Sequence, residues 1–120
     1  PAIGRLQDAM RAYPELVAGT GQPNVALSKA TGGRVIMKGG AEGYLAVFIP
    51  DQGLGIALKI ADGNSRARVV ALLAVLRELK LLDDAECAAL ADTANPLIRN
   101  SVETVVGRIC ACTLAKAAST

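Results

Sequence analysis

The chain has 120 residues, a length that allows one domain at most, so residues 1–120 are expected to form a single segment. Hydrophobic residues make up 52% of the chain but aromatic residues only 2%, so its core must be built from Ala, Val, Leu and Ile. The formal charge is +2, from 13 basic and 11 acidic residues that form no cluster of either sign. Few aromatic rings are present on which bases could stack, so nucleic acid is not expected as a partner.

The sequence also argues against a membrane or metal-binding protein. Its longest apolar run, 69–76, is far shorter than the ~18 residues that indicate a membrane span, and its first residues do not resemble a signal peptide. Cys87, Cys110 and Cys112 are odd in number, and the chain has no histidine. We therefore expect reduced thiols packed in the core, no metal site made by this chain alone, no cofactor and a cytoplasmic location.

In chain order, the first predicted element is a short amphipathic helix over 3–13. Its apolar residues recur at helical spacing until Pro14 interrupts the pattern. A turn-rich link over 15–21 follows. Asn24 is then the expected N-cap of a second short helix over 25–30, which a pair of glycines ends.

Three strands are predicted next, over 34–38, 44–49 and 54–60. The loop 50–53 joins the last two as a hairpin, because it carries proline and glycine at turn positions. The strands are apolar at nearly every position, which predicts a sheet that is covered on both faces.

The second half of the chain is predicted to be mainly helical. A tight turn over 62–65 opens the strongest helix, 66–79, and Asp83 or Asp84 caps a shorter helix that runs to about residue 92. The apolar face of the strongest helix comprises Val69, Leu72, Leu73, Leu76 and Leu79. The β-branched segment 103–112 reads as a final strand. This order predicts an α+β fold, with an antiparallel sheet and packed helices.

The most informative segment is 34–43, in which a strand runs directly into Lys38. Three glycines follow within five positions: Gly39, Gly40 and Gly43. Glycine allows the backbone to approach a ligand closely and to adopt positive φ, so one cation beside bare backbone is typical of a small-molecule site. A plain turn at a strand end would show the same pattern.

Several blocks of the chain resemble, in order, the motifs of one family, the type II, thermolabile (rhizobial-type) L-asparaginases. The matching blocks are Tyr13–Gly21 (YPELVAGTG), Lys38–Gly43 (KGGAEG), Gly53–Gly63 (GLGIALKIADG), Arg66-Ala67, and Asn95–Asn100 with Val106-Gly107. Together they span most of residues 3–110. The chain departs from the family at Tyr13, where histidine is usual, and at Glu103, where glycine is common.

The resemblance implies the fold shared by serine β-lactamases and a class of glutaminases, with L-asparagine as substrate. Lys38 would complete a serine–lysine pair and either orient the serine hydroxyl or, if burial neutralises its ammonium, accept the hydroxyl proton. Gly39, Gly40 and Gly43 would let the backbone approach the substrate or its oxyanion, and Glu42 could contact the substrate.

The serine half of this machinery is not found in the sequence. A Ser-x-x-Lys motif places the nucleophile one helical turn from its lysine. No lysine stands three positions after Ser28, Ser65, Ser101 or Ser119, and Thr113–Lys116 has only the spacing. We therefore expect this chain to correspond to the carboxy-terminal portion of the family's domain, to be inactive alone, and to form a homo-oligomer or to pair with a complementary amino-terminal half.

Two other functions stay open. The same fold could act on another acyl-transfer substrate, such as glutamine or a β-lactam, although the GAEG sequence after Lys38 favours asparaginases. The chain could instead be a non-enzymatic interaction module that pairs through exposed apolar sheet, which its apolar composition and missing nucleophile favour.

Single residues near the glycines also have plain structural interpretations. Glu42 could form a structural hydrogen bond or salt bridge beside the turn. Lys59 fits a solvated strand lysine, Asp62 a helix cap, and Arg66 and Arg68 surface charges.

Overall fold

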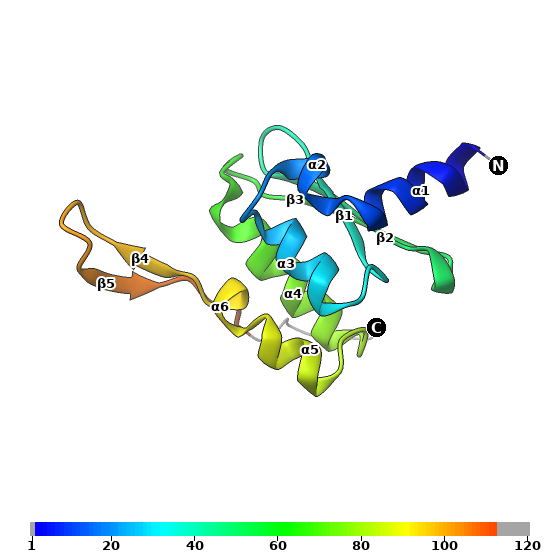
Figure 1. The fold of residues 1–120 in the computed structure, drawn as a ribbon. Helices are drawn as coiled ribbons and strands as arrows, with labels where there is room; N and C mark the ends of the chain where they lie inside the picture. Colours follow the sequence, from blue (N-terminus) through cyan, green and yellow to red (C-terminus); the bar gives the residue numbers. More distant parts are fainter. Residues whose placement is uncertain (1, 113–120) are drawn as a thin grey trace, which may run out of the picture. The chain divides into compact units, whose positions relative to one another are not determined.

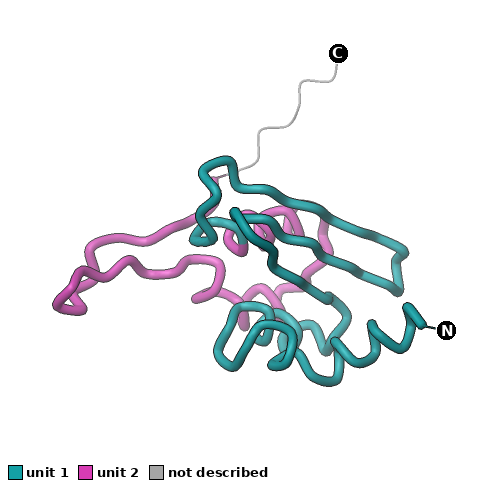
Figure 2. The backbone as a smooth tube through the Cα atoms, turned by 90° about the horizontal axis from the view of Figure 1, so that it is seen from above, with its two compact units in different colours: residues 1–68 teal, residues 69–120 magenta. Residues whose placement is uncertain are grey.

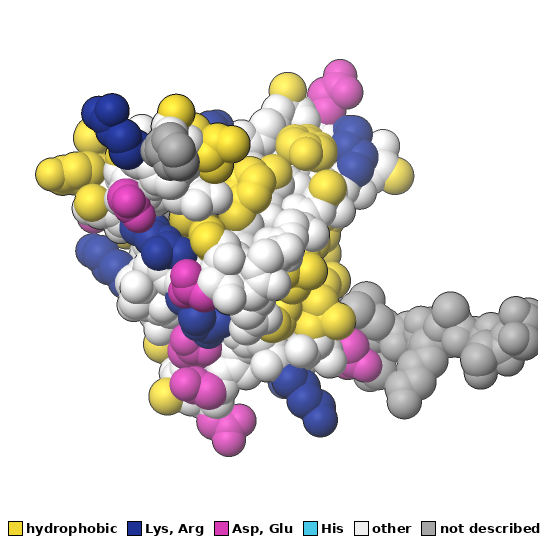
Figure 3. All heavy atoms as spheres, turned by 90° about the vertical axis from the view of Figure 1, so that its right-hand side faces the viewer, with side chains coloured by type: hydrophobic (Ala, Val, Ile, Leu, Met, Phe, Trp, Pro, Cys, Tyr) yellow, Lys and Arg dark blue, Asp and Glu magenta, His cyan; other side chains and the backbone are white. Residues whose placement is uncertain are grey.

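The computed structural model of the chain describes residues 2–112 and has the predicted α+β fold, with helices and two antiparallel sheets (Figure 1). The chain forms two compact units, Pro1–Arg68 and Val69–Thr120 (Figure 2). Within residues 2–112, no helix has the length and apolarity that crossing a bilayer requires. On the face drawn in Figure 3, hydrophobic side chains reach the surface between charged side chains of both signs.

The first unit holds three helices and a three-stranded sheet. Its elements are α1 (Ala2–Ala12), α2 (Pro14–Ala18), α3 (Pro23–Ala30), β1 (Ile36–Gly39), β2 (Tyr44–Ile49), the 3-10 turn Pro50–Gln52, β3 (Leu54–Lys59) and the 3-10 turn Ser65–Ala67. The sheet order is β1-β2-β3 with antiparallel pairing throughout, and each of the three helices contacts β1. The three predicted strands and their hairpin loop are confirmed.

The sheet is covered on both faces only in part, so the prediction of a sheet covered on both faces holds at β1, where the adjacent residues Ile36 and Met37 are both buried, and fails at β2. Along β2, Leu45, Val47 and Ile49 are buried, whereas Tyr44 and Phe48 are 42% and 40% exposed. Successive strand residues point to opposite faces, so this alternation is that of a half-buried strand. The apolar residues on the exposed face hide the alternation in the sequence.

Proline accounts for two differences in the helical part of this unit. Pro14 occupies the first turn of α2, where its missing N–H costs nothing, so part of the predicted link is helical. Pro23 likewise opens α3, with Gln22 as the N-cap residue. Asn24 therefore lies inside the helix, buried, and its side chain donates to the Pro14 carbonyl at 2.9 Å. The prediction of Asn24 as N-cap is wrong.

The second unit contains the rest of α4 (Arg68–Glu78), together with α5 (Asp84–Ala89), α6 (Ala91–Ala94), β4 (Leu97–Arg99) and β5 (Val105–Arg108). The predicted apolar face of α4 is buried over four of its five residues. Leu79 lies beyond the helix end and is 53% exposed, so its place in that face was predicted wrongly. Buried α4 side chains are Val69, Val70, Leu72, Leu73 and Leu76.

The hairpin of β4 and β5 differs from the single strand expected over 103–112. β5 is shorter and pairs with β4, which sequence analysis missed, and all seven strand residues are exposed. Cys110 and Cys112 follow this hairpin and are also exposed, so the prediction that their thiols pack in the core is wrong. Cys87 is half-buried. An exposed strand has no buried face to impose alternation on its sequence, which explains the missed β4.

Asp83 caps α5 through a capping box with Glu86. The Glu86 N–H donates to Asp83 Oδ1 at 2.7 Å, and the Asp83 N–H donates to Glu86 Oε2 at 2.9 Å. Asp83→Ala is therefore expected to lower the free energy of unfolding by about 1 kcal/mol in urea titrations. Asp84→Ala, next in the chain and outside the cap, should cost clearly less. Equal losses from both substitutions would contradict the importance of the cap.

Candidate functional site

Lys38 lies near the end of an edge strand, because β2 is the one strand neighbour of β1 among the described residues. The N–H of Gly40 donates to the Tyr44 carbonyl at 3.0 Å. In an antiparallel ladder the bonded pairs alternate, so the N–H and C=O of Gly39 face away from β2, toward the open edge. Lys38 Nζ donates to that Gly39 carbonyl at 2.7 Å, which places the ammonium at the open edge of the sheet.

A tight turn follows and returns the chain into β2. Its central residues, Glu42 and Gly43, have φ of 56° and 71°, and the Tyr44 N–H donates to the Ala41 carbonyl at 3.2 Å. Positive φ at both central residues is typical of the primed turns that join antiparallel strands. Glu42 is strained in this conformation because it carries a side chain.

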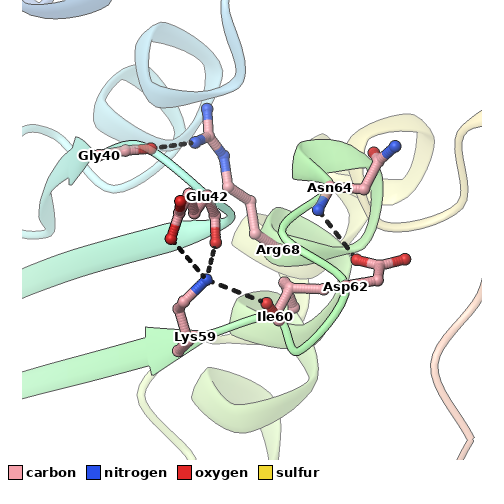
Figure 4. A network of polar contacts seen from close by, with 7 residues as sticks. All are labelled: Gly40, Glu42, Lys59, Ile60, Asp62, Asn64 and Arg68. Carbon is pink, nitrogen blue, oxygen red and sulfur yellow. Dashed lines mark hydrogen bonds and ion pairs between the residues drawn. The ribbon is translucent and has the colours of Figure 1, made fainter.

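Lys59 holds the strained residue of this turn from the neighbouring strand end. Its ammonium donates to the main-chain carbonyl of Glu42 and lies 4.0 Å from the Glu42 carboxylate (Figure 4). It also donates to the Ile60 carbonyl at 3.3 Å. Lys59 is half exposed and stabilises the turn through these contacts. Glu42 forms the structural salt bridge that the sequence analysis gave as the alternative to a contact with substrate.

The space that each glycine leaves free is taken by a side chain of the same unit. A Cβ on Gly39 would lie 3.1 Å from both terminal nitrogens of Arg68, and a Cβ on Gly40 would lie 2.9 Å from Cδ1 of Tyr44. A Cβ on Gly43 would lie 2.9 Å from Cβ of Ile60. Packing alone therefore favours glycine at these positions, most strongly at Gly43, and the predicted approach of substrate to these residues stays a prediction.

The turn after β3 carries Arg68 to the glycines. The Asn64 N–H donates to Asp62 Oδ1 at 2.9 Å (Figure 4). The Arg66 N–H donates to Asn64 Oδ1 at 2.9 Å. Asn64 is thus the N-cap of the 3-10 turn, and the prediction that Asp62 caps it is wrong. Asp62 instead stabilises the turn and accepts from the Arg66 guanidinium at 3.2 Å.

Arg68 is the residue of this site that the sequence did not reveal. It is half-buried rather than a surface charge, and its Nη1 donates to the Gly40 carbonyl at 3.3 Å (Figure 4). In a regular ladder that carbonyl would accept from Tyr44, whose N–H is used by the turn. Arg66 is exposed, as predicted. Arg66 and Arg68 both stand at the start of one helix and look alike in the sequence. They differ in the structure because Gly39, which has no Cβ, leaves room for the guanidinium of Arg68.

The described residues supply one half of the expected catalytic pair. Lys38 is exposed among residues 2–112. Its hydrogen bond among these residues is to a carbonyl and not to a serine. Ser119 and the Thr113–Lys116 segment lie outside the described residues. In residues 2–112, no group of three or more Cys, Asp or Glu side chains could hold a metal ion.

The family model of L-asparaginase II matches residues 1–111. The chain therefore belongs to the type II L-asparaginase family, and the resemblance stated from its motifs is confirmed. Membership supports an asparaginase-type hydrolase function in general, with asparagine as the substrate that the family implies. No curated protein matches the chain.

The tight packing at Gly43 gives a direct test of the turn. Gly43→Ala would combine positive φ with a 2.9 Å contact to Ile60, so unfolding free energy should fall by about 2–3 kcal/mol. Gly53→Ala is the matched control, because Gly53 has φ of 60° but open space around it. The control should lose only about 1 kcal/mol in the same urea titration. Equal losses would show that the contact with Ile60 does not matter.

Proposed function

We propose that this chain is the lysine-bearing, carboxy-terminal portion of an L-asparaginase that works by serine–lysine acyl transfer. The observation that carries the proposal is the position of Lys38 on the open edge of the sheet, in a chain that belongs to the L-asparaginase II family. A substrate beside that edge can reach both the ammonium and the main-chain groups of Gly39. The serine belongs to a Ser-x-x-Lys motif expected upstream.

The reaction follows from these roles. The serine hydroxyl oxygen attacks the side-chain amide carbon of L-asparagine, while the ammonium of Lys38 stabilises the developing negative charge. The hydroxyl proton passes to the leaving nitrogen, and ammonia departs, which leaves an aspartyl ester on the serine. Water then cleaves the ester, releasing L-aspartate and restoring the serine hydroxyl.

The open edge of β1 also favours a partner on that side of the sheet, either a complementary amino-terminal half or a second copy. The cytoplasm is the proposed location, because three free thiols suit a reducing compartment.

A second candidate function is a non-catalytic interaction module of the same fold. The exposed face of the sheet favours it, since Tyr44 and Phe48 present aromatic surface there. Such a module would bind a protein partner through the sheet and would not need Lys38.

Ammonia release from L-asparagine and L-glutamine separates these functions. The chain alone is expected to be inactive, and activity should arise when it is mixed with a polypeptide that supplies the Ser-x-x-Lys half. L-Asparagine should be the preferred substrate. No activity from a mixture shown to form a folded complex would favour the interaction module, and activity of the chain alone would contradict the assignment of the nucleophile.

Removing the ammonium tests Lys38 itself. In the active form, Lys38→Met should lower kcat at least about 100-fold, because charge stabilisation next to the nucleophile is lost. Lys29→Met is the matched control, since the Lys29 side chain is 71% exposed and lies near Glu15 instead. Near-normal turnover of the Lys38 variant would remove this residue from the mechanism.

A further inference from the structure

The guanidinium of Arg68 lies flat against Gly39. The position of a Cβ on Gly39 is 3.1 Å from each of Nη1 and Nη2 and 3.2 Å from Cζ of Arg68. Because this position is almost equally far from the three atoms, the guanidinium lies nearer to face-on than to edge-on against Gly39. Its N–H donors therefore point mainly past Gly39, and one of them, on Nη1, reaches the Gly40 carbonyl.

Among residues 2–112, one hydrogen bond uses the N–H donors of Arg68. A guanidinium has five N–H donors, and the hydrogen bond of Arg68 to the Gly40 carbonyl, at 3.3 Å, is a long one. Arg11 and Arg66 pair with Asp51 and Asp62, each at 3.2 Å, whereas among residues 2–112 no ion pair joins Arg68 to a carboxylate. Arg68 is also half-buried, so its charge has less water around it than an exposed arginine has.

Arg68 and Lys38 hold adjacent carbonyls. Lys38 donates to Gly39 and Arg68 donates to Gly40, so two cations flank one short stretch of backbone. The nearest acidic turn residue, Glu42, is held by Lys59 (Figure 4). The charge around this stretch is therefore positive, which favours a ligand that carries an anionic group.

We propose that Arg68 binds the α-carboxylate of the substrate, an inference that rests on the proposed function. The planar fork of a guanidinium matches the two oxygens of a carboxylate, which a lysine ammonium does not. Arg68 then selects free amino acids that bear a side-chain amide, and it disfavours asparagine whose α-carboxyl group is blocked, as it is within a peptide. Lys38 remains the residue that acts at the amide.

The test compares L-asparagine with L-asparaginamide, whose α-carboxylate is replaced by a neutral amide, with hydrolysis measured at the side-chain amide. The active form should prefer L-asparagine in kcat/KM by about 10- to 100-fold, the range for a charged hydrogen bond. Arg68→Gln should abolish the preference, mainly by raising KM for L-asparagine, and Arg68→Lys should restore part of it. Arg66→Gln removes the same charge two residues away and should keep the preference.

A ratio of two substrates on one protein is insensitive to a partly unfolded sample. If Arg68→Gln slows both substrates equally, Arg68 only positions the glycine stretch, and the inference is overturned. The proposed function stands in that case, because the parent protein still releases ammonia.

If the unsubstituted protein shows no turnover, binding of the ligand to Arg68 is measured instead. In ¹⁵N-labelled chain, the Arg68 Nε–H resonance should shift with L-asparagine and not with L-asparaginamide, because the two compounds differ at the α-carboxyl group alone. A selective shift in a folded mixture with the Ser-x-x-Lys half that releases no ammonia would support the carboxylate site and defeat the proposed reaction. No shift would overturn the carboxylate site.

Discussion

The close packing of three side chains against three glycines fixes the position of Lys38. Arg68 covers Gly39, the Tyr44 ring covers Gly40, and Ile60 lies beside Gly43. A larger residue at Gly43 would meet both Ile60 and nearby backbone, whereas a larger residue at Gly39 would displace the end of the Arg68 side chain. The glycines therefore act on the candidate site through packing. Contact of their main-chain groups with a substrate belongs to the proposed function.

The one-sided burial of β2 connects this packing to function. Leu45, Val47 and Ile49 pack β2 into the core, and β1, which carries Lys38, pairs with β2. On the opposite face Tyr44 and Phe48 are partly exposed, and among the described residues β1 keeps one open edge. A strand end with open surface beside it is suited to binding a small substrate, a second polypeptide, or both.

The sequence predicted the elements whose signals are local. The three strands of the first unit have apolar runs bounded by glycine and proline, and the α5 cap follows from Asp83. Elements without a buried face, such as β4, left no periodic signal. Asn24 and Arg68 were misread because their partners, the Pro14 carbonyl and the Gly40 carbonyl, are 10 and 28 positions away. Contacts at that range depend on tertiary structure and cannot be read from neighbouring residues.

The central claim is that Lys38 assists the transfer of an acyl group from substrate to a serine. Detection of the acyl-enzyme tests this claim most directly. The active form would be quenched during turnover of L-asparagine and analysed by intact-mass and peptide mass spectrometry. We predict an aspartyl ester on one serine of the Ser-x-x-Lys motif, and its loss in Lys38→Met. A folded, active protein that forms no such ester, or a Lys38→Met variant that forms it at the parent rate, would contradict the proposed mechanism.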